Sequence, residues 1–315
     1  MTYLILLLAL TALIFGANIL VRGAVSLAAT LGVPTFVIGL TIVAWSTSAP
    51  ELVVSLTAGL QGEYGIALGN IIGSNLANIL LIGGLAAVLI PLSTASQGLR
   101  LNALLLLFIS LVLIAMVASG YLNAFVGAGL IALKAVSLYL SFTGSGQGDA
   151  GEPVEPAAMT LLRAAALVLG GAVLVGVGGF SLVDSATDLA ELWELPSAVI
   201  GLSVVALGTS LPELMATIAA ARQRQGDLII GNIIGSNIAN ILIVLGFTAL
   251  LAPGRLSYGV SYLPVLTLML LSTLALVGFV ILRQSIGRRT GLVLLLTYTL
   301  FVVASFETEA GDPFL

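Results

Sequence analysis

The sequence predicts an all-α membrane protein with ten transmembrane helices in two inverted-topology repeats of five. Three observations support this fold class: the composition, the number of long apolar segments, and an internal duplication. Of the 315 residues, 59% are hydrophobic and only 8% are charged, and the mean hydropathy is +1.21. A soluble domain of this length would carry many more charged residues on its surface. We therefore expect the surface of the protein to be covered by a lipid bilayer.

Ten apolar segments are long enough to cross the hydrocarbon core, which takes about 20 helical residues. They are residues 3–21, 34–60, 64–90, 101–119, 122–142, 158–180, 196–221, 227–251, 260–282 and 289–306. The first segment lacks a basic start and a small-residue cleavage site, so we interpret it as a span and not as a signal peptide. A hydrophilic stretch rich in glycine, proline and acids, residues 143–157, is expected to be a cytoplasmic linker. It separates a first repeat, 1–142, from a second, 158–315.

The two halves match each other at a constant offset of 162 positions. LTIVAWSTSAPEL at 40–52 aligns with LSVVALGTSLPEL at 202–214, and GNIIGSNLANIL at 69–80 aligns with GNIIGSNIANIL at 231–242. Such self-similarity indicates a duplication. Because five spans is an odd number, the second copy must enter the membrane in the opposite direction, as in many secondary transporters.

The distribution of basic residues predicts that both termini lie outside the cell. With that orientation, nearly all arginines fall at cytoplasmic ends, as the positive-inside rule requires. Only Arg255 lies outside, and Lys134 fits worst because it lies within the fifth span, where it is expected to snorkel to the cytoplasmic end or to pair internally. The cytoplasmic set is Arg22, Arg100, Arg163, Arg222, Arg224, Arg283, Arg288 and Arg289.

The composition also excludes several kinds of chemistry. The net charge is −4, so no basic patch is available for nucleic acid. The chain has no cysteine and no histidine, which removes thiolate sites and the usual ligands of transition metals. Oxygen donors remain, and they suit hard cations. We expect lipid and cations as partners, no cofactor, and a monomer or weak homo-oligomer.

Two glutamates, Glu51 and Glu213, lie inside strongly apolar segments. An ionised side chain at mid-membrane costs about 2.5–3.5 kcal/mol, and Lys134 cannot neutralise both. Each glutamate follows a proline, which removes a helix hydrogen bond and predicts a kink. Non-helical backbone at this depth is typical of ion cavities. On the same helix face lie the hydroxyls three and four positions earlier, which are Thr47, Ser48, Thr209 and Ser210.

The duplicated GNIIGSN segments place a row of polar side chains in an apolar helix. The row has a spacing of four residues, so its members share one face; they are Asn70, Ser74 and Asn78, repeated as Asn232, Ser236 and Asn240. The glycines of the same segments have GxxxG spacing, which indicates close helix packing. Ca2+ takes about 6–8 oxygen ligands. Two carboxylates with these hydroxyls and amides supply enough donors and balance one divalent charge.

These paired blocks resemble the α-repeats of the Na+/Ca2+ exchanger family within the cation/Ca2+ antiporters. The resemblance implies that Ca2+ binds Glu51, Glu213 and the carbonyls of Thr47 and Thr209. It implies Na+ sites at Ser48, Ser74 and the Ala44 carbonyl, at Ser210, Ser236 and the Ala206 carbonyl, with Asn78 and Asn240 lining the centre. Many members have aspartate at the position of Asn240, and Trp45-Ser46 departs from the Leu-Gly of the second repeat.

The sequence therefore predicts a secondary antiporter that exchanges Na+ for Ca2+ by alternating access, with the first and sixth spans sliding against a fixed core. Acid should inhibit it, because neighbouring carboxylates without an ion favour binding a proton. An H+/Ca2+ exchanger, a K+-dependent exchanger and, less favoured, a cation channel stay open as alternatives. An intramembrane hydrolase using Ser48 or Ser210 is not favoured, since no histidine is available, and we expect no enzyme activity. The lack of a large regulatory domain suggests a prokaryotic cell membrane.

Overall fold

The computed structural model describes residues 2–62, 64–94, 97–120, 123–144, 159–192, 206–252 and 263–309. Regular structure in these ranges is helical, and the only β pairing is an isolated bridge between Leu92 and Ile286. The first half contains α1 Thr2–Leu31, α2 Thr35–Ile38, η1 Gly39–Val43, α3 Ala44–Thr47, α4 Ala49–Leu60, α5 Tyr64–Leu76, η2 Ala77–Ile82, α6 Gly83–Leu89, α7 Gln97–Ser119 and α8 Ala124–Gly144. The second contains α9 Leu161–Leu192, α11 Ala206–Thr209, α12 Leu211–Arg222, α13 Gly226–Ala239, η4 Asn240–Val244, α14 Leu245–Leu251, α15 Leu263–Ile281 and α16 Arg288–Glu309.

The described helices confirm a multi-pass membrane protein. Seven are long and apolar enough to cross a bilayer, and a bent pair, Thr35–Thr47 with Ala49–Leu60, raises the count to eight. A shorter apolar helix, Ala124–Tyr139, falls on the predicted fifth span. The first part of the predicted seventh span, residues 196–205, lies outside the described residues.

Helix α1 continues about three turns beyond the predicted end of the first span, so that Arg22 lies within it. No proline or strained glycine interrupts this stretch, and the helix ends where Gly32 adopts a φ of +66° just before Pro34. A positive φ is accessible to glycine at little cost and closes a helix. The end of α1 is therefore set by this glycine and not by the arginine.

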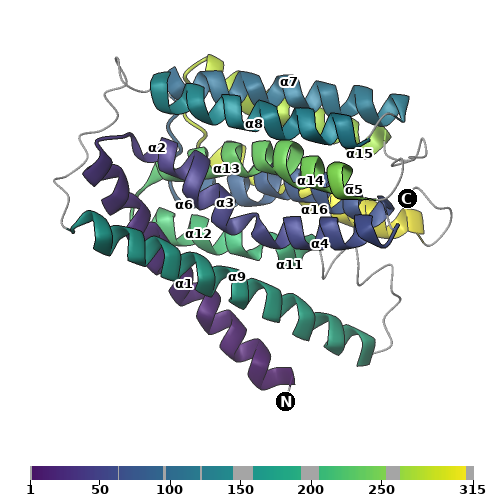
Figure 1. The fold of residues 1–315 in the computed structure, drawn as a ribbon, viewed down its shortest axis with the longest axis horizontal. Helices are drawn as coiled ribbons and strands as arrows, with labels where there is room; N and C mark the ends of the chain where they lie inside the picture. Colours follow the sequence, from purple (N-terminus) through teal and green to yellow (C-terminus); the bar gives the residue numbers. More distant parts are fainter. Residues whose placement is uncertain are drawn as a thin grey trace.

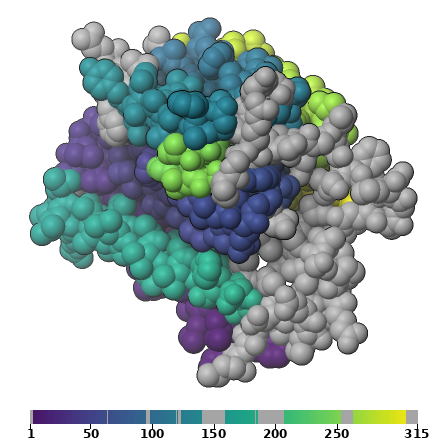
Figure 2. Space-filling model, turned by 45° about the vertical axis from the view of Figure 1, so that its right-hand side comes forward, coloured from purple at the N-terminus to yellow at the C-terminus, as the bar shows by residue number. Residues whose placement is uncertain are grey.

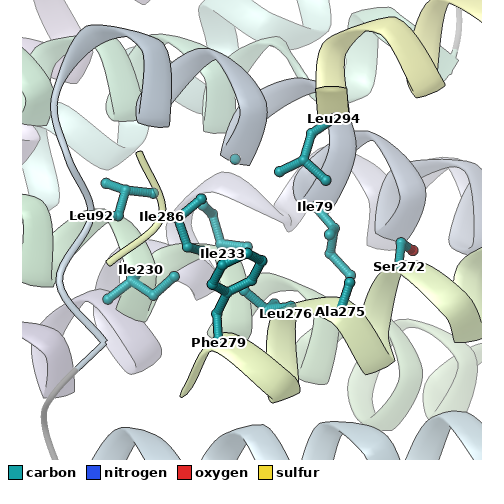
Figure 3. A pocket seen from close by; sticks show the side chains of 11 residues that line it. Ile79, Leu92, Ile230, Ile233, Ser272, Ala275, Leu276, Phe279, Ile286 and Leu294 are labelled. Atoms are coloured by element: carbon teal, nitrogen blue, oxygen red, sulfur yellow. The ribbon is translucent and has the colours of Figure 1, made fainter. Parts of the chain in front are cut away.

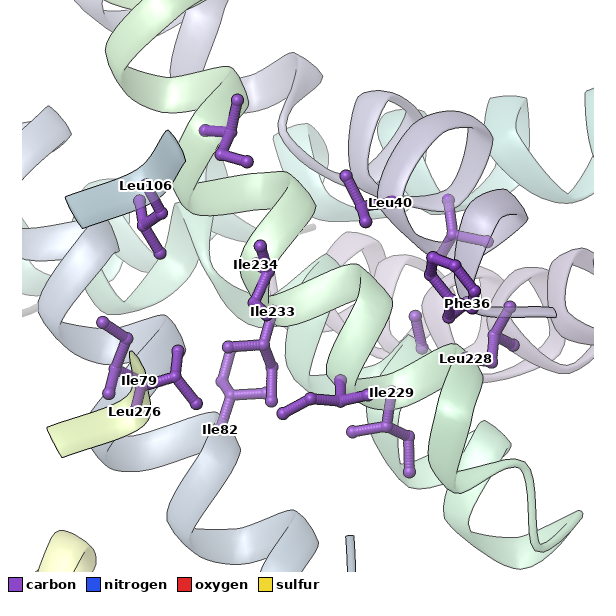
Figure 4. Packing of buried hydrophobic residues seen from close by; sticks show 14 of the residues in the cluster. Phe36, Leu40, Ile79, Ile82, Leu106, Leu228, Ile229, Ile233, Ile234 and Leu276 are labelled. Atoms are coloured by element: carbon purple, nitrogen blue, oxygen red, sulfur yellow. The ribbon is translucent and has the colours of Figure 1, made fainter. Parts of the chain in front are cut away.

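Helix α13 forms the centre of the molecule. It packs against α2, η1 and α3 on one side and against α7 and α12 on others, and nearly all of its residues are buried. Figure 4 shows isoleucines of α13 between Phe36 and Leu40 of the first bent helix and Ile79 and Ile82 of η2. The bent helix is thus held against an apolar core formed by both halves of the chain.

Helices α1 and α9 lie side by side, apart from α7 and α8 on the opposite side of the molecule (Figure 1). Glycines let the two backbones approach closely. A Cβ on Gly16 would lie 2.7 Å from Leu174 Cβ and 3.1 Å from the Gly171 carbonyl oxygen. A Cβ on Gly178 would lie 3.2 Å from Ala12 Cβ and 2.9 Å from the Ala9 carbonyl oxygen. These two sets of contacts interchange when 162 is added to one and subtracted from the other.

The outer surface of this pair is apolar. Figure 2 shows α9 crossing one face of the molecule with parts of α1 behind it. Large hydrophobic side chains are exposed along both helices and along α16, among them Tyr3, Leu7, Phe15, Leu162, Leu169, Val173, Leu292 and Leu296. So many exposed apolar side chains are expected of helices that face lipid.

Lys134 does not behave as predicted. It lies on the buried face of α8 with Gly127, Leu130 and Ser137, and only 1% of its surface is exposed. Its Nζ has no hydrogen-bond partner among the described residues, so neither snorkelling nor internal pairing is observed. The reason is position: α8 packs face to face with α14, and Lys134 lies on the face of α8 that is buried by its neighbours.

Candidate functional site

Two helix breaks, one in each half, position the candidate site. Helix α3 ends at Thr47 and α4 begins at Ala49, with Ser48 at φ −82° and ψ 10°. Helix α11 ends at Thr209 and α12 begins at Leu211, with Ser210 at φ −84° and ψ 0°. In the first half the helix bends by 47°. The kink predicted from the proline is confirmed there, and the same break recurs in the second half because Pro50 and Pro212 lie in the first turn of the following helix.

The breaks bring Glu51 and Glu213 into one buried site. Each lies in the first turn after its break, and their exposed fractions are 0% and 1%. Glu213 accepts a hydrogen bond from Ser48, which lies at the break one turn before Glu51, so the two carboxylates belong to the same region of the core. No basic side chain of the described residues pairs with either, and no third acidic side chain joins them in a cluster within the described part of the chain.

A side chain of the first repeat contacts Glu213. The Ser48 hydroxyl donates a hydrogen bond of 2.9 Å to Glu213 Oε1. Glu213 Oε2 has no hydrogen-bond partner among the described residues. The second carboxylate is therefore oriented by the broken helix of the opposite repeat, with one oxygen left for a ligand.

Glu51 keeps both carboxylate oxygens without a hydrogen-bond donor in the described structure. The Ser74 hydroxyl of α5 is also buried and has no hydrogen-bond partner among the described residues. The hydroxyls of Ser210 and Ser236 are also buried without a partner there. A buried polar atom without a partner costs about 1–3 kcal/mol, so this cluster of oxygens favours binding a cation.

The two threonines differ in their contacts. The Thr47 hydroxyl donates to the Val43 carbonyl at 3.1 Å and lies 3.3 Å from the Ala44 carbonyl. The Thr209 hydroxyl donates to Asn70 Oδ1 at 3.2 Å. The Ala44 carbonyl, one of the predicted Na+ ligands, also accepts the Ser48 amide at 3.0 Å, and Ala206 begins α11.

Asn78 and Asn240 lie where their helices change to π-helical geometry. Segment η2 covers Ala77–Ile82 and η4 covers Asn240–Val244, and both asparagines are buried. A third such segment, η1, precedes Ala44. Wide turns of this kind are rare and often occur at functional sites. The sequence pattern did not predict them, because a π turn leaves no signature in hydrophobic periodicity.

The predicted glycine packing is confirmed in the second repeat. A Cβ on Gly231 or Gly235 would collide with the carbonyl oxygens of Phe36 and Leu40, so α13 touches the backbone of the first bent helix. No atom of the described residues approaches Gly69 or Gly73 in this way. The equivalent partners of those glycines, around residues 198–202, lie outside the described residues.

A small cavity elsewhere in the core does not suit an ion. Figure 3 shows aliphatic and aromatic side chains from η2, α13 and α15 converging on it, with Leu92 and Ile286 at one end. Among its lining residues only Ser272 carries a polar side chain, and that hydroxyl donates to its own helix at Met269. A cation there would find almost no oxygen ligands, so the glutamate site is the better candidate.

Comparisons with known proteins agree with this geometry. The model of the family described as sodium/calcium exchanger protein matches residues 1–143 and 163–307. The chain is 38% identical over 261 residues to the inner membrane protein YrbG of Escherichia coli, covering 80% of each chain. It is 34% identical over an alignment of 348 positions to the sodium/calcium exchanger MaX1 of Methanosarcina acetivorans, covering 96% of this chain and 98% of that one.

The fold is also similar to a solved exchanger. A structure of the sodium-calcium exchanger NCX_Mj soaked with Na+ and Sr2+ superposes with a TM-score of 0.83 at 31% identity, over 96% of this chain and 98% of that one. The family match covers most of the chain, and the superposition extends over nearly all of it. This chain belongs to the sodium/calcium exchanger family.

Proposed function

We propose that the protein is a secondary antiporter that exchanges Na+ for Ca2+ across a prokaryotic cell membrane. The observation that carries this proposal is the pair Glu51 and Glu213: both are buried at the two helix breaks, Ser48 of the first break bonds Glu213, and neither glutamate has a basic partner among the described residues. Two carboxylates balance the charge of one Ca2+ or part of the charge of several Na+. One set of oxygens can therefore serve both ions in turn, which is what an exchanger requires.

The full architecture belongs to the same proposal. It has ten spans in two inverted repeats, 1–142 and 158–315, joined by a cytoplasmic linker at 143–157, with both termini outside. The interchange of contacts between α1 and α9 supports a twofold relation, and so do the equal breaks at Ser48 and Ser210. Helices α1 and α9 pack mainly on each other and expose an apolar outer face, as expected of a pair that slides against the core.

The assignment of ligands follows the resemblance. Ca2+ takes Glu51, Glu213 and the carbonyls of Thr47 and Thr209, and Na+ ions take flanking positions. The unpartnered oxygens of Glu51, Ser74, Ser210 and Ser236 support it. Asn240 adds an amide where many relatives have a carboxylate, so the acidic charge of the site comes from the two glutamates.

The test is uptake of radiolabelled Ca2+ into proteoliposomes loaded with Na+. We expect uptake only when the Na+ gradient is directed outward, with no uptake when internal Na+ is replaced by K+ or by a pH difference. Uptake driven by the pH difference in Na+-free buffer would identify an H+/Ca2+ exchanger. A need for K+ in addition to Na+ would identify the K+-dependent type, and Ca2+ flux without any counter-ion gradient would identify a channel.

A further inference from the structure

Three of the hydrogen bonds between the two repeats join side chains of the duplicated motifs, and the symmetry-related pair of each is not bonded. The first involves Asn70. It accepts the Thr209 hydroxyl at 3.2 Å, while its amide lies 2.9 Å from Ser55 Oγ and 3.3 Å from the Glu51 carbonyl oxygen. Adding or subtracting 162 gives the counterpart, in which Thr47 would donate to Asn232. This counterpart bond is absent, because the Thr47 hydroxyl donates to the Val43 carbonyl of its own helix instead.

The open counterpart leaves polar atoms unpaired. Asn232 Oδ1 and Thr217 Oγ1, the equivalents of Asn70 Oδ1 and Ser55 Oγ, are buried and have no partner among the described residues. Both side chains are present in the second repeat and adopt the same helical positions as their equivalents. They differ in their hydrogen bonds, because Asn70 bonds both to Ser55 of its own repeat and to Thr209 of the other, whereas neither bond has a counterpart at Asn232.

The second and third bonds follow the same pattern. Asn240 donates to Asn75 Oδ1 at 3.2 Å, whereas in the counterpart Asn78 Nδ2 and Asn237 Oδ1 are both buried without a partner in the described structure. As described above, Ser48 donates to Glu213, whereas the Ser210 hydroxyl and the Glu51 carboxylate do not bond. Each of the three pairs is closed once and open once.

The two repeats have nearly the same motif sequence but different hydrogen bonds, and this difference can be explained by energy. Closing both copies would satisfy more buried groups, and each unsatisfied one costs about 1–3 kcal/mol. The two repeats carry the same polar groups at equivalent positions, so neither arrangement is favoured by sequence alone. Exchange of the two arrangements would close the open set and open the closed one at similar energy, which is the property of a two-state element.

We propose that Asn70 with Asn75, and Asn232 with Asn237, form two interchangeable latches, one of which is closed in each access state of the transporter. This inference rests on the proposed antiport, because exchange of the latches would accompany the sliding of α1 and α9 that opens the site to one side of the membrane or the other. The asparagines are positioning residues. In a closed latch, the asparagine of α5 or α13 is hydrogen-bonded to the other repeat, as Asn70 of α5 is to Thr209 of the second broken helix.

The experiment uses the absence of cysteine from the chain. A single reporter, Ser74→Cys, is labelled with a membrane-impermeant thiol reagent added to the outside or the inside of oriented proteoliposomes without Ca2+. The ratio of the two labelling rates measures the ratio of outward-open to inward-open molecules. Asn70→Ala removes bonds present in the state described here, and Asn232→Ala removes bonds made in the other state.

We expect the two variants to shift the labelling ratio about tenfold in opposite directions, the change that about 1.4 kcal/mol produces. The double variant should return to the parental ratio, because it weakens both states. Asn102→Ala is the matched control, since this buried amide donates to Gly98 of its own helix at 3.0 Å. It should leave the ratio unchanged. If the asparagine variants fold poorly, Ser55→Ala and Thr217→Ala should give the same opposite signs with smaller shifts.

Shifts in the same direction, or no shift, would overturn the latch proposal even if the parent protein exchanges Na+ for Ca2+. Opposite shifts in a protein that shows no Na+-dependent Ca2+ uptake would support the latches and reject the antiport. The two failures are therefore distinguishable.

Discussion

Replacing Glu213 by glutamine tests the site most directly. The substitution keeps the shape of the side chain and leaves an amide oxygen that can accept the hydrogen bond from Ser48. It removes one of the two carboxylate charges that no basic residue of the described chain neutralises. The fold should therefore persist while ion binding weakens.

The size of the effect follows from electrostatics. A carboxylate about 3 Å from Ca2+ attracts it by about 11 kcal/mol at an effective dielectric constant of about 20. Dehydration of the ion and the dipole of the glutamine carbonyl offset most of this. Removing one charge of a buried pair typically costs about 2–5 kcal/mol, which corresponds to a loss of about 30-fold to several thousand-fold in Ca2+ affinity. The Coulomb loss for Na+ is half as large, so Ca2+ should suffer more.

The assay is the concentration dependence of radiolabelled Ca2+ uptake by Na+-loaded proteoliposomes, with binding of Na+ measured by its competition. Asp184→Asn is the control, because it removes one negative charge from an exposed position on α9; its uptake should match that of the parent. Uptake by Glu213→Gln within about threefold of the parent protein would refute the assignment of this residue to the ion site.

Three further results are expected. Lowering the pH should reduce Ca2+ uptake and raise the Ca2+ concentration needed for half-maximal rate, because a proton on Glu51 or Glu213 removes charge that the ion needs; inhibition that excess Ca2+ cannot relieve would contradict this. Gly16→Ala should lower the unfolding free energy by about 1–3 kcal/mol through overpacking against α9, whereas Gly176→Ala, with no atom of the described structure within 4 Å, should be neutral or stabilising in thermal unfolding. Lys134→Met should raise the melting temperature in detergent, because an unpaired buried ammonium is replaced by an apolar chain of similar length; a lower melting temperature would show that Lys134 has a stabilising partner.

Much of the candidate site could be predicted because its signals are local. The TSxPEL blocks place hydroxyls one turn from each glutamate, and the prolines at 50 and 212 remove helix hydrogen bonds, so the breaks followed from covalent chemistry. The duplication indicated that both copies serve one site. Lys134 could not be placed in this way, because its burial depends on which face of α8 meets α14.

The hydrogen bond between Asn75 and Asn240 and the π-helical segments could not be predicted from the periodicity of the sequence. Asn75 and Asn237 differ from Asn70 and Asn232 by five positions and were not expected to bond across the repeats, yet Asn75 accepts Asn240. The π-helical segments shift the register of η2 and η4 by a fraction of a turn, which changes the faces that residues beyond them present. Such shifts are set by packing against neighbouring helices.

The sequence by itself determined that the protein is embedded in a bilayer, that it contains an internal duplication, and that two carboxylates lie within apolar helices. These properties follow from composition and from spacing along one chain. Only the tertiary structure decided that Glu213 is held by Ser48 while Glu51 is free of donors in the described part of the chain, and that one set of cross-repeat bonds is closed while its copy is open. Two copies of one sequence have equal local preferences, so a difference between them can arise only from how the helices are placed against each other.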